Sequence, residues 1–303
     1  MTRALVVWQW RDGKRGHERQ CAGLVQALGE RLPLSYHVLD VPRPGLRRFA
    51  AFVAGVVRAG AALPSPDLIV GAGRACQWPL LAARRARGGR AIYLMRPQLP
   101  VACFDLCIVP RHDRPPPASN VFVSDGPLNP MRAAATRDSM LGLILLGGPS
   151  AHYRWDDDAL AAQIDLLLAL HPDLTWYASD SRRSPLALGR RLAARGDLIF
   201  KSHHDTPDEW LPAQLARAAQ AWVSTDSVAM VYEAFSAGAA VGLLEVPARR
   251  ADRITAIATD LRARGLVTTL GAPHRTVAPP ALAEAARCAE LILTRWPDLA
   301  NRA

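Results

Sequence analysis

Residues 222–242 read WVSTDSVAMVYEAFSAGAAVG, and the pattern predicts a strand, a polar turn and a helix. The strand ends at Val223, the turn holds three hydroxyls and one carboxyl, and the helix runs from about Val228 to Ala237 with Gly238 as its stop. Unpaired N–H groups and the positive end of the helix dipole favour an anion at such a helix start.

Glu233 follows one to two turns into this helix, where its carboxylate is placed to accept hydrogen bonds from a sugar diol. We therefore expect this stretch to hold the diphosphate and ribose of a nucleotide-sugar. The alternative is that Thr225, Asp226 and Ser227 only cap the helix and that Glu233 is a solvated helix residue.

The composition is that of an ordinary globular protein. The chain has 303 residues, 50% of them hydrophobic and 21% charged, enough for two domains with sizeable cores. Its net charge of +10 predicts an anionic partner: a nucleotide diphosphate, an anionic membrane surface or nucleic acid. No zinc finger, helix-turn-helix or aromatic RNA-stacking motif is evident, so nucleic acid is the weakest of the three.

The five cysteines are scattered in apolar surroundings, which is typical of reduced, buried thiols in a cytoplasmic protein. Cys103 and Cys107 have no second pair of Cys or His at metal-ligand spacing, so we expect no metal site. No secretory signal pattern or membrane-spanning run is evident, and we expect a cytoplasmic location. The segment 46–60 is apolar with Arg at its ends. It is either an ordinary helix packed on the sheet or a helix that makes peripheral contact with an anionic leaflet of the inner membrane.

Strands and helices alternate along both halves of the chain, which predicts an α/β protein with doubly wound parallel sheets. The region 129–139 has the composition of a linker. We expect an N-terminal domain over 1–135 and a C-terminal, nucleotide-binding domain over 136–303. In an alternative arrangement, the last helix of the chain packs back on the N-terminal domain. Three acids at 156–158 introduce a helix, and capping explains them better than a metal does.

Three further segments carry candidate site residues. The first is DGKRGHERQ, residues 12–20, which we expect to be a glycine-bearing loop between the first strand and a helix over 21–32; the alternative is a solvated basic turn. The second is the turn GAGR, 71–74, after another strand. The third is the loop SDSRRSP, 179–185, whose paired Arg side chains suit a phosphate.

Two Rossmann-like halves resemble the GT-B architecture of nucleotide-sugar glycosyltransferases, in which the halves face each other across a cleft. A closer resemblance lies in the motif order: residues 12–20, 71–74, Pro110-Arg-His-Asp113, Gly126-Pro-Leu-Asn129, Gly147-Gly-Pro-Ser150, Ser181-Arg-Arg183, and Thr225–Ser227 with Glu233. This series is similar to that of the mitochondrial fission family typified by the plant "elongate mitochondria" protein, which is widespread in bacteria. For the plant member the resemblance implies recruitment of a dynamin-type factor to a membrane.

The function expected from these motifs is a metal-independent glycosyltransferase that uses a nucleotide-sugar as donor, without a further cofactor, and a lipid-linked or glycan acceptor in the envelope. His17 is the candidate general base, and Asp12 its catalytic neighbour. The expected nucleotide-binding residues are Gly147, Gly148, Ser150, Ser181, Arg182, Arg183, Lys201, Thr225, Asp226, Ser227, Met230 and Glu233. The expected acceptor-side or anion-binding residues are Gly13, Lys14, Gly16, Gln20, Gly71, Gly73, Arg74 and His112.

Two alternatives stay open: a nucleotide-sugar epimerase or hydrolase built on the same frame, and a non-catalytic scaffold that recruits a partner to a membrane.

Overall fold

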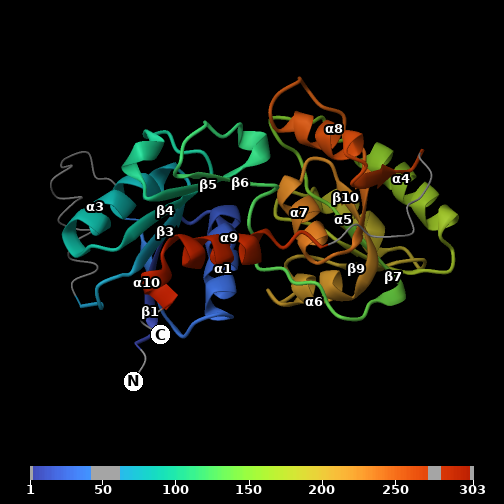
Figure 1. Ribbon diagram of the computed structural model, residues 1–303. Coiled ribbons are helices and arrows are strands. Elements are labelled where there is room, and N and C mark those ends of the chain that lie inside the picture. Colours follow the sequence, from blue (N-terminus) through green and yellow to red (C-terminus); the bar gives the residue numbers. More distant parts are fainter. Residues whose placement is uncertain (1–2, 42–61, 272–280, 301–303) are drawn as a thin grey trace. The chain divides into compact units, whose positions relative to one another are not determined.

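The computed structural model describes residues 3–41, 62–271 and 281–300. The chain divides into two compact units: unit 1 comprises Met1–Pro130 and Ala283–Ala303, and unit 2 comprises Met131–Leu282. Each unit is built on a six-stranded sheet (Figure 1). The apolar segment 46–60, for which a membrane contact was predicted, lies outside the described residues.

Unit 1 has the strand order β2-β1-β3-β4-β5-β6, and each neighbouring pair is parallel. Its strands are β1 (Leu5–Arg11), β2 (Leu34–Asp40), β3 (Leu68–Ala72), β4 (Arg90–Leu94), β5 (Leu106–Pro110) and β6 (Val121–Ser124). Its helices are α1 (Arg15–Gly29), α3 (Gln77–Arg87), α9 (Glu284–Arg295) and α10 (Pro297–Ala300), with short 3-10 turns η1 (Arg74–Cys76), η2 (Val101–Cys103) and η3 (Arg111–Asp113).

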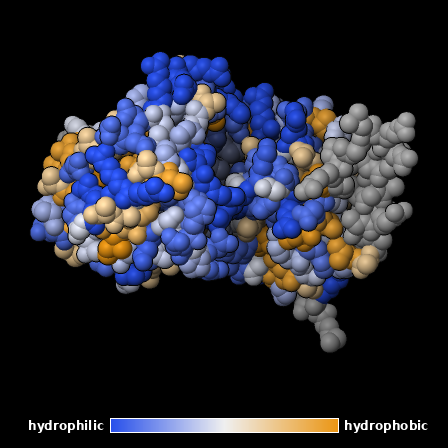
Figure 2. All heavy atoms as spheres, turned by 180° about the vertical axis from the view of Figure 1, so that it is seen from behind, coloured by the Kyte–Doolittle hydropathy of each residue, from blue (hydrophilic) through white to orange (hydrophobic). Residues whose placement is uncertain are grey.

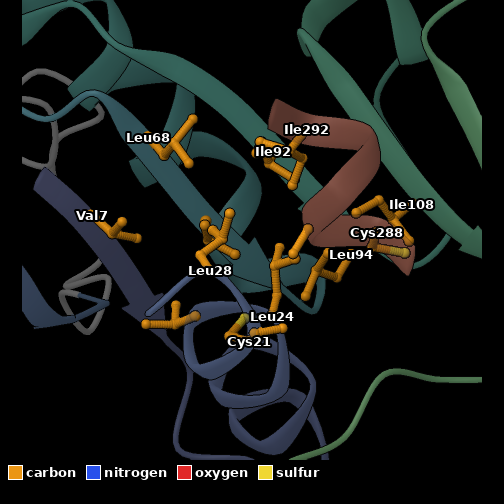
Figure 3. Packing of buried hydrophobic residues seen from close by; sticks show 14 of the residues in the cluster. Val7, Cys21, Leu24, Leu28, Leu68, Ile92, Leu94, Ile108, Cys288 and Ile292 are labelled. Atoms are coloured by element: carbon orange, nitrogen blue, oxygen red, sulfur yellow. The ribbon is translucent and has the colours of Figure 1, made fainter. Parts of the chain in front are cut away.

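Alternate residues of the central strands enter two separate cores, as the period of two in a strand requires. On β1, Val7 packs with α1 and α9, whereas Trp8 packs with α3 on the other face. Figure 3 shows the first of these cores, in which α1 contributes Leu24 and Leu28 and α9 contributes Cys288 and Ile292. The C-terminal helix therefore completes the core of the N-terminal sheet.

Unit 2 has the strand order β12-β11-β10-β7-β8-β9, again parallel throughout. Its strands are β7 (Asp138–Leu145), β8 (Thr175–Ser179), β9 (Ile199–Lys201), β10 (Ala218–Ser224), β11 (Ala240–Leu244) and β12 (Val267–Thr269). Its helices are α4 (Asp157–Leu170), α5 (Leu186–Ala193), α6 (Trp210–Arg217), α7 (Val228–Ser236) and α8 (Thr255–Ala263).

The predicted doubly wound α/β class is confirmed in both sheets, because cores lie on both faces of each. The predicted cap of α4 is also confirmed, since the Asp156 carboxylate accepts hydrogen bonds from the N–H groups of Asp158 and Ala159. Helix α5 and strand β12 were not predicted. Leu186 and Leu188 flank an alanine in a short segment that is too brief to show a helical period.

None of the helices in the described part of the chain combines the length and the apolar character needed to cross a membrane. On the face drawn in Figure 2, hydrophilic side chains cover most of the surface and apolar ones lie in separate small groups.

Candidate functional site

In unit 2 the order of connection reverses at β7, which has β8 on one side and β10 on the other. Loops that leave neighbouring parallel strands in opposite directions open a crevice at the carboxyl ends of those strands, and ligands of doubly wound sheets bind there. The loop after β7 is Gly147-Gly-Pro-Ser150, and the loop after β10 is Thr225–Ser227. Two motifs separated along the chain therefore meet at this point.

Hydrogen bonds join these two loops directly. The Gly147 N–H donates to Ser224 Oγ at 2.8 Å, and the Gly148 N–H donates to Asp226 Oδ2 at 2.9 Å. A Cβ placed on Gly147 would lie 2.2 Å from Asp226 Oδ2, far inside van der Waals contact. The first residue of the pair must be glycine, because any side chain would displace the carboxylate.

The loop after β8 joins the same network through Arg183. Its Nη2 donates to Asp226 Oδ2 at 2.8 Å, and its Nη1 donates to the Gly148 carbonyl at 2.6 Å. The hydroxyls of Ser181 and Ser184 both donate to the Gly147 carbonyl. The Asp226 side chain is 0% exposed, whereas that of Arg183 is 42% exposed, so the guanidinium is the part of this ion pair that a ligand can reach.

The turn after β10 uses most of its polar groups inside the protein. Thr225 Oγ1 accepts a hydrogen bond from Val246 N at 2.9 Å, and the Ser227 N–H donates to the Ser224 carbonyl at 3.0 Å. Asp226 is the anion at the Gly148 N–H, a place that the sequence analysis gave to a ligand phosphate. The side chain of Asp226 thus holds Arg183, and that of Thr225 bonds the backbone of Val246. The prediction that this turn holds the diphosphate stays a prediction.

The groups of this turn left for a ligand are in the first turn of α7. The first N–H groups of a helix have no partner within the helix. Val228 and Met230 are partly exposed there, and Ala229 is exposed. Ser227 lies at the N-cap without a side-chain capping bond, so the interpretation of these hydroxyls as caps is wrong for Ser227.

Glu233 is 6% exposed, so the alternative that it is a solvated helix residue is wrong. It lies three residues after Met230 on α7, and residues at this spacing share one face of a helix. Its role towards ribose stays a prediction.

The remaining predicted residues of unit 2 lie at the same edge of the sheet. Arg182 follows β8 and Lys201 ends β9, and both are exposed. Ser150 is partly exposed, and its Oγ accepts a hydrogen bond from the His152 N–H at 3.3 Å.

In unit 1 the order of connection reverses between β1 and β3, and the loops after these strands carry the other candidate residues. Asp12 Oδ2 lies 2.9 Å from His17 Nδ1, and Asp12 Oδ1 accepts a hydrogen bond from the Lys14 N–H at 3.1 Å. Gly73 has a φ of 84°, and a Cβ there would lie 2.2 Å from His17 Nδ1. Glycine is thus required at this position by its backbone conformation and by the close approach of the imidazole.

This arrangement has the form of a carboxylate-oriented histidine. When Asp12 accepts from the Nδ1 nitrogen, Nε2 is the nitrogen left to act as a base. The Asp12 side chain is 4% exposed and that of His17 is 19% exposed, so the ring, not the acid, meets solvent. The structure brings together the two residues that the sequence analysis proposed as catalytic.

The predicted loop at 12–20 is shorter than expected, because α1 begins at Arg15 and not near residue 21. The Lys14 carbonyl accepts from the N–H groups of His17 and Glu18 and starts the helix early. Gly16, His17 and Gln20 therefore lie on the helix, where Gln20 is buried.

The other predicted residues of unit 1 divide by exposure. Gly71 is buried within β3, where a Cβ would press on Cys76 and Leu80. Gly13 and Lys14, which follow Asp12 in the sequence, are exposed. Arg74 is also exposed, and it follows Gly73 in the neighbouring loop. His112 lies in η3 after β5, at the same edge but farther along the sheet.

Two histidine–carboxylate pairs of unit 2 were missed. His203 Nδ1 lies 2.8 Å from Asp180 Oδ1, and His152 Nδ1 lies 2.7 Å from Asp252 Oδ2. No spacing in the chain connects His152 with an acid one hundred residues later. Within residues 3–41, 62–271 and 281–300, no three His, Cys, Asp or Glu side chains are grouped to hold a metal ion.

A family model described as "Mitochondrial fission ELM1" matches residues 15–296. A search among curated proteins finds no match.

Solved structures resemble the whole chain at low identity. UDP-GlcNAc 2-epimerase from Methanocaldococcus jannaschii has a TM-score of 0.57 at 10% identity, over 96% of this chain and 100% of that one. Staphylococcus aureus MnaA with UDP has a TM-score of 0.55 at 13% identity, over 100% and 98%. Acinetobacter baumannii MurG has a TM-score of 0.50 at 16% identity, over 99% and 93%. These likenesses establish a GT-B-like fold of two Rossmann-like units.

Proposed function

The chain belongs to the mitochondrial fission ELM1 family, and on that premise we propose that it is a glycosyltransferase that uses a nucleotide-sugar as donor. The observation that carries the proposal is that functional groups gather in each unit at the point where the strand order reverses. Unit 2 presents a guanidinium and a helix start, and unit 1 presents a carboxylate-oriented histidine. A transferase needs these two functions, a grip on the leaving diphosphate and a base for the acceptor.

In this proposal the donor lies on unit 2. The first turn of α7 and the exposed face of Arg183 hold the diphosphate, with Arg182 and Lys201 as further cations. Fixed cations stabilise the negative charge that develops on the leaving diphosphate, which is the task that a metal serves in other transferases. Glu233, on the face of α7 that also carries Met230, takes the ribose hydroxyls.

His17 acts on the acceptor hydroxyl. Its Nε2 removes the proton as the oxygen attacks the anomeric carbon and the bond from that carbon to the diphosphate breaks, while Asp12 holds the ring through Nδ1. The basic residues Lys14 and Arg74, exposed near this pair, favour an acceptor that carries negative charge, such as a lipid-linked glycan.

The first experiment measures nucleotide binding. Thermal shift and calorimetry with UDP, GDP, ADP and CDP should identify at least one nucleotide that raises the Tm. The Arg183→Ala variant should weaken its binding about tenfold or more, because hydrogen bonds to charged groups contribute about 1.5–3 kcal/mol. Arg191→Ala is the matched control, since Arg191 is an exposed arginine on α5 that pairs with Asp158. If no nucleotide raises the Tm, the transferase proposal fails and the scaffold takes its place.

The ribose assignment has its own test. Glu233→Gln keeps the shape of the buried side chain and should weaken binding of the nucleotide but not of inorganic pyrophosphate. Equal losses for both ligands, or no loss for either, would remove Glu233 from the ribose site.

A nucleotide-sugar epimerase is the second candidate, because structures of similar fold bear that title. The two candidates differ in product: a transferase or hydrolase releases free nucleoside diphosphate, whereas an epimerase leaves the nucleotide attached to an altered sugar. Incubation with a UDP-sugar, with water taking the sugar in place of the unidentified acceptor, followed by anion-exchange chromatography separates these outcomes. His17→Gln should abolish release of UDP and leave donor binding unchanged if His17 serves the acceptor.

A further inference from the structure

A second histidine–carboxylate pair lies beside the nucleotide switch point of unit 2 and has no role in the function proposed so far. His152 Nδ1 lies 2.7 Å from Asp252 Oδ2, and the His152 side chain is 37% exposed. The other oxygen of Asp252 accepts hydrogen bonds from the N–H groups of Ile254 and Thr255 at 2.8 and 3.1 Å. The carboxylate is held at the start of α8, and it fixes the ring through one nitrogen, so that Nε2 is the nitrogen left for a ligand.

Hydrogen bonds tie this pair to the glycine loop on one side. His152 follows Gly147-Gly-Pro-Ser150 after one residue, and its N–H donates to Ser150 Oγ. Its own carbonyl accepts from the Arg249 N–H at 2.8 Å. The neighbouring Tyr153 forms an antiparallel bridge with Ala248.

The same segment after β11 is tied to the turn after β10. The Val246 N–H donates to Thr225 Oγ1, and Thr225 Oγ1 donates to the Val246 carbonyl at 3.2 Å. Residues 246–249 therefore contact the turn after β10 and the segment that follows the glycine loop. His152 is held between these contacts and the glycine loop.

Tyr153 adds a second sign that this place is built for a polar ligand. It is 3% exposed, and its hydroxyl has no hydrogen-bond partner among the described residues. Burial, with the carboxylates of Asp226 and Asp252 as further causes, raises the pKa of Tyr153 to about 12. The tyrosine therefore lies within electrostatic reach of both the switch-point acid and the acid that holds His152.

We propose that His152 is a donor-site residue, whose Nε2–H hydrogen-bonds to a non-bridging oxygen of the nucleotide's diphosphate when the ring carries its proton. This inference rests on the proposed function, because it assigns a further ligand group to the same nucleotide site. Asp252 pairs with the ring, and the Nε of Arg250 lies 3.7 Å from Asp252 Oδ2. In the sequence, Arg154 stands two residues after His152, and Arg249 and Arg253 stand within three residues of Asp252. Segments this rich in arginine suit an anionic partner such as a diphosphate.

The experiment compares the affinity for UDP, or for whichever nucleoside diphosphate raises the Tm most, between pH 5.5 and 8.5. While Nδ1 pairs with Asp252, Nε2 carries a hydrogen only on a protonated ring, so the wild-type protein should bind about tenfold more tightly than His152→Gln at pH 5.5 and by a smaller factor at pH 8.5. The ratio of the two affinities is used because the nucleotide's terminal phosphate also titrates at about pH 6. Asp252→Asn keeps an acceptor for the start of α8 but removes the charge beside the ring, and it should lose part of the same pH dependence.

His171→Gln is the matched control, because His171 precedes β8 at the opposite edge of the sheet; its affinity ratio should stay at one. If the wild-type protein and His152→Gln bind the nucleotide equally at every pH while their Tm values differ, His152 only stabilises the contact between the loops, and the inference is overturned. If the wild-type protein binds no nucleotide at all, the proposed function fails first, and the two failures are thereby distinguished.

Discussion

The contact between Gly147 and Asp226 allows a quantitative test of the switch point in unit 2. In Gly147→Ala the new methyl would lie 2.2 Å from Asp226 Oδ2, on a carboxylate with no exposed surface into which it could move. Overpacking costs about 1–3 kcal/mol, and displacement of the charged hydrogen bond to the Gly148 N–H costs about 1.5–3 kcal/mol more. We expect the free energy of unfolding of unit 2 to fall by about 3 kcal/mol.

Asp226→Ala should cost a similar amount, about 2–3 kcal/mol, because it leaves the buried Gly148 N–H without an acceptor. The part due to Arg183 is small, since that side chain is 42% exposed and solvent screens its charge. The double variant should be less than additive. Once the carboxylate is gone, the methyl enters vacated space, and the total loss should stay near about 3 kcal/mol instead of about 5–6, a coupling in the range typical of residues in contact.

The assay is urea titration read by hydrogen exchange of peptides from residues 131–271, so that unit 2 is followed separately from unit 1. Gly196→Ala is the control, because a Cβ there meets no atom within 4 Å; it should change the stability by less than about 0.5 kcal/mol. If the effects of Gly147→Ala and Asp226→Ala add to within about 0.5 kcal/mol, the two residues do not act through the contact described, and the account of the glycine loop is refuted.

Three further outcomes follow from contacts elsewhere. In a urea titration, Ile292→Ala should lower the free energy of unfolding of unit 1 by about 2–5 kcal/mol, because Ile292 is buried. Thr294→Ala, at an exposed position of the same helix, should change that free energy by less than about 0.5 kcal/mol. Equal effects would place α9 outside the core of unit 1. Iodoacetamide at pH 8 should label the partly exposed Cys103 well before the buried Cys76, because burial raises the pKa of the Cys76 thiol to about 12. Mass spectrometry of the native protein measures the order of labelling, and the reverse order would contradict this burial. The hydrogen bond from His152 lowers the pKa of Asp252 to about 2, below its unfolded value of about 3.9, so the stabilising contribution of Asp252 is present above pH 4 and is lost as the pH falls towards 2. The free energies of unfolding of the wild-type protein and of Asp252→Asn should therefore converge over that pH window. A difference that stays constant would contradict the pairing.

The local pattern of the sequence determined the class of fold. Runs such as Leu141–Leu146 are apolar throughout because strands of a parallel sheet are buried on both faces, and the structure places a strand there. The three acids at 156–158 identified the start of α4, because the N–H groups that Asp156 caps lie only two and three residues away. The glycine motifs after β1, β3 and β7 were likewise found, since a tight turn after a strand requires glycine nearby in sequence.

The tertiary structure alone decided which groups these motifs face. The Gly148 N–H meets the carboxylate of Asp226 across 78 positions of sequence, so a turn that resembled an empty anion site already holds an anion from its own chain. The same limit applies to His152 and Asp252, which are one hundred positions apart in the sequence. Periodicity records whether a residue is buried, but the identity of its neighbour depends on strand order and chain crossing, and these are properties of the packed molecule.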